Sequence, residues 1–390
     1  MRLRPALVLW HRWFGLLGAL WLFLLGATGS ILVFHEEIDH GLNADWFTAS
    51  HGPSLPVSQL VGAAIAVHPG NRPGYIDLPD EPGDVVTVYL EPIVRPGQSP
   101  AAPPSYWQIF IDPATAKVLG ARDANAIDLS RRGLMSFLYT FHYSLHLGAW
   151  MTWILGLVGL VWIIDHIASA VLSFPNAARW KESFRIRRRA AGHKRVFDLH
   201  RAVGLWLFPI TLTLAATGVY FNWSDDVLMA IDRISPLTKR PDQAVAALAE
   251  PLDRPPVSAD QALALAGAAR VDSLSYNPAK GIYWLRLFDP RDIDSNGGRW
   301  LFVDARSGAV IGDRHFSEGS AGDVVVAWQF PLHSGKAFGW AGRIAIFLSG
   351  IALCTFVVTG LMIWWRKRSA RHVAVRRPAA QTERSVAPAE

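Results

Sequence analysis

Cysteine is almost absent from this chain of 390 residues, and the one thiol, Cys354, lies inside a long apolar run. A single cysteine excludes an intramolecular disulfide and any zinc or iron–sulfur site that needs several thiolates. The sequence also lacks a glycine-rich dinucleotide fingerprint between a strand and a helix. If the protein carries out redox chemistry, its electrons must therefore come from a separate donor.

Charged side chains are missing from four long segments, residues 13–35, 133–164, 202–224 and 344–365. A helix needs about 20 consecutive apolar residues to cross a bilayer. The sequence therefore predicts an integral membrane protein with four transmembrane helices. The first segment is too long for a signal peptide and has no cleavage pattern, so we predict that it is retained as a span.

The predicted organisation alternates these helices with two larger domains. Its boundaries are transmembrane helices at 10–35, 133–174, 200–224 and 328–365, domains at 36–132 and 225–327, a loop at 175–199 and a tail at 366–390. Within the first domain, the proline-rich segment 95–104 is predicted to be a loop.

Basic residues indicate on which side of the membrane each connection lies. The loop between the second and third helices carries a dense basic run at 179–195, and Arg2, Arg4 and the segment 366–368 flank the first and last spans. Short cytoplasmic connections are enriched in Lys and Arg. We predict that both termini are cytoplasmic and that the two domains lie on the opposite side. The net charge of +6 then reflects membrane topology and does not indicate a nucleic-acid partner.

The sequence repeats itself within the spans and within the domains. Residues 11–16 match residues 200–205, and both segments continue in register to a Thr-Gly pair. Residues 109–120 match residues 301–312, and each segment reads as a strand, an Asp-led turn and a second strand. The chain is therefore predicted to be an internal duplication.

Each half is predicted to be a helix, a small α+β domain and a second helix. A third match supports this organisation, because it aligns His146 with His333 close to the even-numbered spans. A short helical pattern and a strand pattern precede each hairpin. We expect the two domains to share one fold, a helix packed on an antiparallel sheet that includes Phe110 or Phe302.

With these features the chain resembles the PepSY-associated transmembrane family over almost its whole length. The resemblance rests on the His-Arg-x-x-Gly-Leu helix starts at His11 and His200, on the two hairpins, and on the Leu-His-x-Gly segment at 332–335. The first hairpin departs from the family pattern, since Ala116 stands where glycine is usual.

Within this family the chain is similar to reductases of the bacterial inner membrane that act on iron–siderophore complexes. The resemblance implies b-type haem held by paired histidines, and we predict two such groups. It also implies a multi-pass protein of the inner membrane with two PepSY-like domains in the periplasm.

A haem iron in a membrane needs neutral imidazoles from facing helices. Because the repeat equates His146 with His333, we predict that these residues hold one haem on the periplasmic side. His142 precedes His146 by one turn on the same helical face, so it is an alternative ligand or a neighbouring polar group. His11 and His200 are predicted to hold a second haem on the cytoplasmic side.

Arginines close to these histidines are candidates for binding haem propionates. They are Arg12, Arg201 and Arg343. His166 is an alternative ligand on the cytoplasmic side, because an ionisable residue within a span is a functional candidate. Its neighbour Asp165 has no partner that the sequence identifies.

Two functions follow from these features. In the first, the protein accepts electrons from a quinol or a cytoplasmic reductase, passes them through haem and reduces a ferric siderophore in the periplasm. Tyrosine and tryptophan residues of the two domains are then candidate contacts for the chelate, namely Tyr106, Trp107, Tyr143, Tyr283, Trp284 and Trp300. In the second, the protein is a non-enzymatic accessory or sensor in iron uptake. The sequence identifies neither the siderophore, nor the donor, nor the oligomeric state.

The predicted topology is tested by reporter fusions. A reporter placed near Arg188 should be cytoplasmic, because it follows the basic run, and reporters placed near Gln98 or Asn296 should be on the other side. Alkaline phosphatase and a fluorescent protein, which are active on opposite sides of the inner membrane, report the two locations. The reverse pattern of activity would contradict the orientation.

Overall fold

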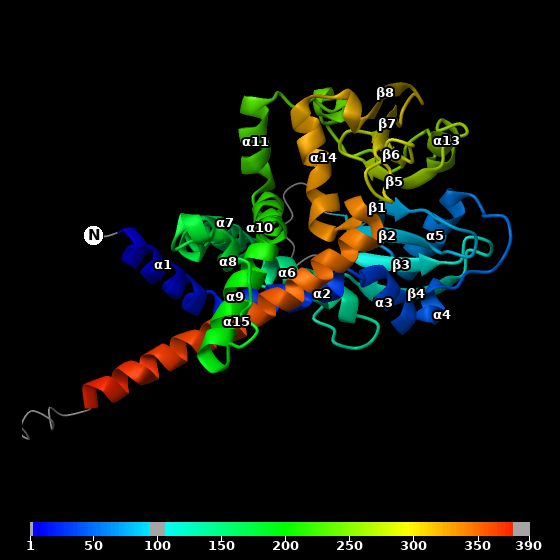
Figure 1. Cartoon of the computed structure of the whole chain (residues 1–390). Helices are drawn as coiled ribbons and strands as arrows, with labels where there is room; N and C mark the ends of the chain where they lie inside the picture. Colours follow the sequence, from blue (N-terminus) through cyan, green and yellow to red (C-terminus); the bar gives the residue numbers. More distant parts are fainter. Residues whose placement is uncertain (1–2, 94–105, 377–390) are drawn as a thin grey trace, which may run out of the picture. The chain divides into compact units, whose positions relative to one another are not determined.

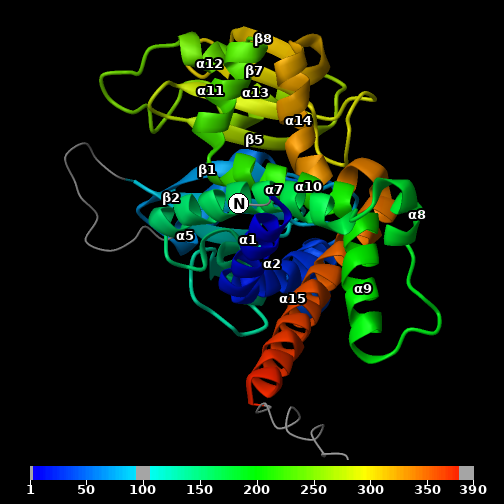
Figure 2. The same cartoon turned by 60° about the vertical axis from the view of Figure 1, so that its left-hand side comes forward.

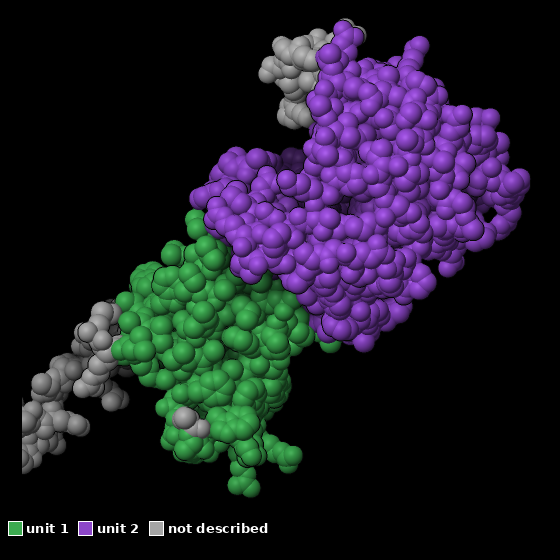
Figure 3. Space-filling model, turned by 90° about the horizontal axis from the view of Figure 1, so that it is seen from above, with its two compact units in different colours: residues 1–30, 157–216, 347–390 green, residues 31–156, 217–346 purple. Residues whose placement is uncertain are grey.

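A computed structural model of the chain describes residues 3–93 and 106–376. The chain divides into two compact units, shown in different colours in Figure 3. The helical unit comprises residues 1–30, 157–216 and 347–390, and the sheet unit comprises residues 31–156 and 217–346. The predicted loop at 95–104 and the last part of the predicted tail, 377–390, lie outside the described residues.

The long apolar segments are helical (Figure 1). The helix α7 (Ala149–Ser173) and the segment 336–369, most of which belongs to α15 (Gly339–Arg376), are long and apolar enough to cross a membrane. Two further pairs pass the same test together, α1 (Leu3–Leu17) with α2 (Ala19–Leu32) and α9 (Gly192–Trp206) with α10 (Phe208–Asn222). The described part of the chain thus has two candidate spans, or up to four if each bent pair is one span, and the prediction of a membrane protein is confirmed.

The two helix pairs are bent at equivalent positions of the repeat. The bend between α1 and α2 is 62° and the bend between α9 and α10 is 65°. Gly18 and Leu207 mark the breaks, at the same distance after His11 and His200. In the second pair, Pro209 has no N–H and so cannot donate a helical hydrogen bond, which favours a break at this point.

The segments predicted as continuous helices at 133–174 and 328–365 are each divided by a tight turn. The first consists of α6 (Leu134–Ser144) and α7, separated by Leu145 and His146 in the left-handed conformation, with φ of 51° and 57°. The second consists of α14 (Ala321–Ser334), η3 (Lys336–Phe338) and α15, with the turn at Gly335, where φ is 79°.

Close helix packing in the helical unit depends on two glycines. A Cβ added to Gly26 of α2 would lie 2.8 Å from the carbonyl oxygen of Gly350 of α15, and a Cβ at Gly350 would lie 2.2 Å from the Ser30 hydroxyl. The Ser30 hydroxyl donates to the carbonyl of Phe347 at 3.0 Å. Small residues thus allow the backbones of α2 and α15 to approach, as expected within a membrane.

Eight strands form one antiparallel sheet (Figure 1). They are β1 (Asn71–Asp77), β2 (Val86–Pro92), β3 (Trp107–Ile111), β4 (Val118–Asp123), β5 (Val271–Asn277), β6 (Ile282–Leu287), β7 (Arg299–Asp304) and β8 (Val310–His315). Their order is β4-β3-β2-β1-β5-β6-β7-β8, so each repeat contributes four neighbouring strands. We call these halves the first and second sheet domains.

The two sheet domains meet where β1 pairs with β5 (Figure 2). Tyr75 lies opposite Ser275, and Asp77 lies opposite Ser273. The domains that the sequence predicted as separate are therefore joined by backbone hydrogen bonds in one sheet. The predicted common fold, an antiparallel sheet with a helix packed on it, is present in both, and β3 and β7 contain Phe110 and Phe302.

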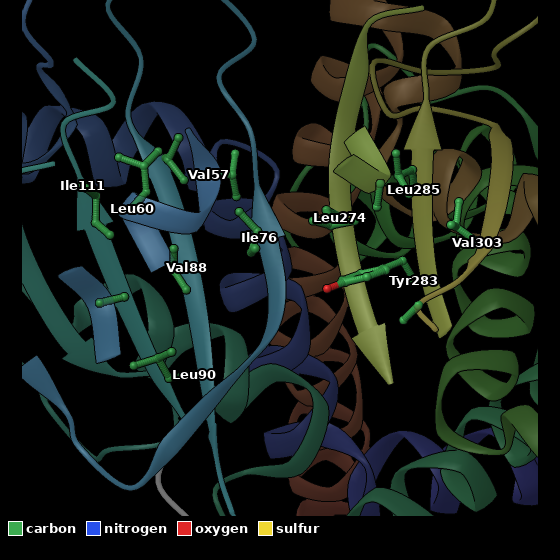
Figure 4. Packing of buried hydrophobic residues seen from close by; sticks show 14 of the residues in the cluster. Val57, Leu60, Ile76, Val88, Leu90, Ile111, Leu274, Tyr283, Leu285 and Val303 are labelled. Carbon is green, nitrogen blue, oxygen red and sulfur yellow. The ribbon is translucent and has the colours of Figure 1, made fainter. Parts of the chain in front are cut away.

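One face of the sheet is apolar and is covered by α5 (Val57–Val67) and α13 (Ala259–Ala264). Leucine, isoleucine and valine side chains alternate along the strands and pack beneath these helices, as Figure 4 shows for Val88 and Leu285. The Asp260 carboxylate of α13 accepts hydrogen bonds from the N–H groups of Val57 and Ser58 at 2.6 and 3.2 Å. The second domain therefore supplies the N-terminal cap of the helix of the first domain.

The remaining helices connect these elements. They are α3 (His35–Leu42), α4 (Ala44–Phe47), η1 (Ala177–Arg179), α8 (Trp180–Ser183), α11 (Ser224–Ile234), α12 (Pro241–Ala244) and η2 (Phe316–Glu318). Helix α3 is held to the sheet by a buried ion pair, in which the guanidinium of Arg122 donates to the Asp39 carboxylate at 2.6 and 2.9 Å. Removing either partner would leave the other charge buried without compensation.

The two hairpin turns share an Asp at their start and a left-handed position four residues later, which a different residue occupies in each turn. Asp112 and Asp304 each accept a hydrogen bond from the N–H two residues later, which initiates the turn. Two residues further on, Ala116 has φ of 56° and Gly308 has φ of 77°. Ala116, the departure from the family pattern, therefore occupies a left-handed position that glycine adopts without strain.

Replacing Ala116 by Gly should stabilise the sheet unit by about 0.5–1 kcal/mol, since relief of the left-handed strain exceeds the entropy that glycine loses on folding. Replacing Gly308 by Ala should destabilise it by about 1 kcal/mol for the opposite reason. Thermal unfolding of the detergent-solubilised protein, followed by tryptophan fluorescence, measures both changes. A shift of the same sign for the two variants would argue against this explanation.

Candidate functional site

Two histidines face each other in the helical unit. His11 lies on α1 and His200 on α9, and their ring centres are 6.2 Å apart with the ring planes at 65°. The repeat equates these residues, so each half of the chain contributes one ring. The structure thus brings together the pair that the sequence predicted on the cytoplasmic side.

A second pair lies in the sheet unit. His142 of α6 and His333 of α14 have ring centres 6.3 Å apart and ring planes at 66°. Here too each half of the chain supplies one ring. The two pairs therefore have almost the same geometry although different helices build them.

The sequence predicted His146 as the partner of His333 and kept His142 as an alternative ligand, and the structure places the His142 ring beside His333. His146 lies in the left-handed turn after α6, stacks on the ring of Phe137 and uses its Nε2 to donate to the Phe137 carbonyl at 2.9 Å. The His146 ring therefore lies back along α6, where it contacts Phe137. The repeat alignment equates chain positions, whereas the turn at Leu145 changes where the next side chain points.

The spacing of both pairs is that of two imidazoles on opposite sides of one metal ion. An imidazole nitrogen lies about 1 Å from its ring centre and about 2 Å from a metal that it binds, so two such rings have centres roughly 6 Å apart. Within residues 3–93 and 106–376, no group of three or more His, Cys, Asp or Glu side chains is arranged to hold a metal. Two protein ligands suit an ion whose other positions are filled by a macrocycle, as in haem.

Hydrogen bonds at Nδ1 leave Nε2 as the ligand atom in three of the four rings. The Nδ1 of His11 donates to the Asp165 carboxylate at 2.9 and 3.1 Å. The Nδ1 of His200 lies 2.9 Å from the hydroxyl of Thr359, and that hydroxyl donates its proton to the Thr355 carbonyl. These bonds fix the neutral tautomer that carries a lone pair on Nε2.

His333 also has a hydrogen-bond partner at Nδ1, whereas His166 has partners at both ring nitrogens. The Nδ1 of His333 lies 2.7 Å from the Thr217 hydroxyl. In His166, Nδ1 donates to the Trp162 carbonyl at 2.8 Å and Nε2 lies 3.0 Å from the Thr211 hydroxyl. Both nitrogens of His166 are therefore in use, which weighs against it as the alternative ligand.

The surroundings of the His11–His200 pair fit a flat macrocycle. A Cβ added to Gly15 or Gly204, each one turn after its histidine, would meet no atom within 4 Å. The Nε of Arg201 is buried and, within the described part of the chain, has no hydrogen-bond partner. Open space beside both ligands and a buried, unpaired donor are what a porphyrin with anionic propionates would use.

The terminal nitrogen of Arg201 is already engaged, since it donates to the Glu182 carbonyl at 3.1 Å and lies 3.5 Å from the Asp198 carboxylate, which leaves Nε as the unpaired donor. The other two candidate arginines have different contacts. Arg343 donates to the Val33 carbonyl at 2.8 Å and to the Glu37 carboxylate at 2.7 Å, and its guanidinium lies over the Trp340 ring. These contacts occupy it, so we assign it a structural role at the start of α15. Arg12 lies over the ring of Trp13.

The second face of the sheet is polar beside the β1–β5 seam, whereas an apolar cluster of Trp46, Ala49, Val85 and Phe110 covers it near β3. Tyr75 donates to the Asp77 carboxylate at 3.4 Å, and Asp272 lies 3.6 Å from the Arg286 guanidinium. Burial, together with the neighbouring carboxylates of Asp272 and Asp80, raises the pKa of Asp77 to about 7. A carboxyl group that is neutral over much of the pH range thus lies next to the seam between the two sheet domains.

The aromatic residues proposed as chelate contacts do not form one cleft. Tyr283 is buried on the apolar face, where its hydroxyl donates to the Val257 carbonyl at 3.0 Å. The rings of Trp284 and Trp300 lie beneath the guanidinium groups of Arg240 and Arg286. A cavity of about 260 Å³ follows the β1–β5 seam on the apolar face, and Tyr283 is the one member of the set that lines it.

These features define a membrane protein with apolar helices and an eight-stranded sheet. Its helices carry two pairs of facing histidines. Residues 8–367 match the family described as the PepSY-associated TM region, and the chain belongs to this family. The family resemblance inferred from the sequence is thereby confirmed. No curated protein matches the chain.

Changing Asp77 to Asn should alter how the stability of the sheet unit depends on pH. The folded pKa of Asp77, about 7, is above the unfolded value of about 3.9, so the stability associated with its neutral form is present below the unfolded pKa and is lost as pH rises through 7. The variant should therefore unfold at a higher temperature than the natural protein at pH 8 and show a smaller difference at pH 5. Equal differences at both pH values would contradict the raised pKa.

Proposed function

We propose that the protein is a haem b oxidoreductase of the inner membrane that reduces a periplasmic ferric siderophore. The observation that carries this proposal is the two pairs of facing imidazole rings, His11 with His200 and His142 with His333. The ring centres of each pair are as far apart as those of two imidazoles that bind one metal ion from opposite sides. The finer topology belongs to the same proposal. It comprises four spans, cytoplasmic termini and two PepSY-like domains in the periplasm.

The histidines and Arg201 would hold the cofactor. The Nε2 atoms of His11 and His200 would bind one iron, and the buried Nε of Arg201 would donate to a propionate. His333, and His142 in place of the predicted His146, would bind the other. Bound haem would supply one-electron transfer, which the side chains of this chain do not provide themselves.

The reaction needs a donor and an acceptor outside the chain. A quinol would give up two electrons and two protons and so would serve two turnovers, whereas a cytoplasmic reductase would supply one electron for each turnover. In each turnover the ferric ion of the chelate gains one electron in the periplasm. The ferrous ion is less charged and binds hard oxygen ligands less strongly, so it leaves the siderophore, which is not consumed. The polar face of the sheet, with Tyr75, Asp77 and Arg286, offers groups that can contact a polar chelate.

The second function is that of a non-enzymatic accessory or sensor protein. It is favoured by the contacts of His146 and His166, which show that histidines of this chain can serve as hydrogen-bonding elements of helix ends and interiors. A colourless purified protein would support this reading over the first.

Haem content distinguishes the ligands from their neighbours. His333→Ala and His142→Ala should each remove about one haem per chain, because a single imidazole holds the iron weakly. His146→Ala is the matched control on the same segment and should keep both, since its ring lies back along α6 and contacts Phe137. Pyridine haemochrome spectra of the purified variants count the haem. Loss of haem in the His146 variant, with full content in the His142 variant, would restore the original assignment.

Reductase activity is tested without the natural donor. The purified protein is reduced chemically under anaerobic conditions and mixed with a ferric hydroxamate and a ferrous-specific chelator. Each haem that is reoxidised should yield one trapped ferrous ion, and the His333→Ala variant should yield fewer. Haem that stays reduced with ferric hydroxamate, catecholate and carboxylate chelates would exclude the reductase function and leave the accessory or sensor function.

A further inference from the structure

The Asp165 carboxylate lies within the apolar helix α7 and contacts the His11 ring. Asp165 is buried on α7, and in the described part of the chain its ion-pair partner within 4 Å is His11 and no Lys or Arg. An unpaired carboxylate in the interior of a membrane is costly. Its charge must therefore be compensated by something that His11 holds or carries.

The Nδ1 partners of the ligand rings differ in charge. His11 has an anionic carboxylate, whereas His200 and His333 have the neutral hydroxyls of Thr359 and Thr217. A carboxylate on Nδ1–H makes the imidazole a stronger electron donor at Nε2. A hydroxyl that receives the same hydrogen bond has a much smaller effect because it carries no net charge.

We propose that Asp165 lowers the reduction potential of iron bound between His11 and His200, so that this site has the lower reduction potential of the two. The iron centre has one more positive charge in the ferric than in the ferrous state, so a nearby buried anion and a stronger imidazole donor both favour the ferric state. Asp165 touches the ligand and not the iron, and is therefore a positioning residue. This inference rests on the proposed function, since it assumes that both pairs bind haem.

The consequence is a fixed direction for electron transfer. One electron would pass from the group held by His11 and His200 to the group held by His142 and His333, with no bond broken and no proton moved. Because the donor site has the lower potential, this step is favourable in the direction from the predicted cytoplasmic side to the predicted periplasmic side.

The test is a spectroelectrochemical titration of the full-length protein with its bound haem. The natural protein should show two one-electron components. Asp165→Asn keeps the shape of the side chain and removes its charge, and it should raise the ferrous-to-ferric ratio of the lower component by roughly tenfold at a fixed potential, or about 59 mV. Thr359→Val, the matched control on the opposite ligand, should shift the same component by much less.

Three results would overturn the inference. The lower component could keep its potential in Asp165→Asn, the higher component could move instead, or Thr359→Val could have an equal effect. If the Asp165 variant fails to retain haem, the His11→Ala variant decides, because the haem that it keeps should be the one with the higher potential. Both haems present with unchanged potentials would reject the role of Asp165 and leave the proposed function intact, whereas a protein without haem would reject both.

Discussion

The pairing of β1 with β5 is the interaction on which the sheet unit depends. Without it, each repeat would present a four-stranded sheet with β1 or β5 as an open edge. The pairing also sets the separation of the two sheet domains, from which α6 and α14 continue. His142 follows the first domain and His333 follows the second, so the backbone register of the seam contributes to the distance between the two rings.

In the helical unit, hydrogen bonds to the imidazole rings decide which ring nitrogens remain available to bind a ligand. A buried imidazole has two nitrogens, and a partner on one of them leaves the other available. His11 and His200 satisfy Nδ1 through Asp165 and Thr359, while His166 satisfies both nitrogens within its own surroundings. The difference between a candidate ligand and a structural histidine is therefore decided by residues far away in the sequence.

Much of the architecture could be predicted from the sequence, because hydropathy and repetition act locally. The apolar segments, the two hairpins and the His11–His200 pair were all visible in this way. The seam between the domains could not be predicted, since strand pairing across about two hundred residues leaves no local pattern. The choice between His142 and His146 stayed open at the level of the sequence, because it depends on a left-handed turn at two residues that do not usually adopt it. Asp165 stood out as an unexplained charge, and only the fold supplied His11 as its partner.

The antiparallel register between β1 and β5 has a further meaning for the ancestry of the chain. A twofold axis perpendicular to a sheet relates two neighbouring strands that run in opposite directions, as β1 and β5 do. A chain with half this length could therefore build the same sheet as a symmetric dimer, in which one histidine from each subunit forms the pair that His11 and His200 form here. Joining the two copies in one chain frees each from the symmetry. A carboxylate such as Asp165 can then appear in one half alone, as it does here, where Ala352 is found at the matching position.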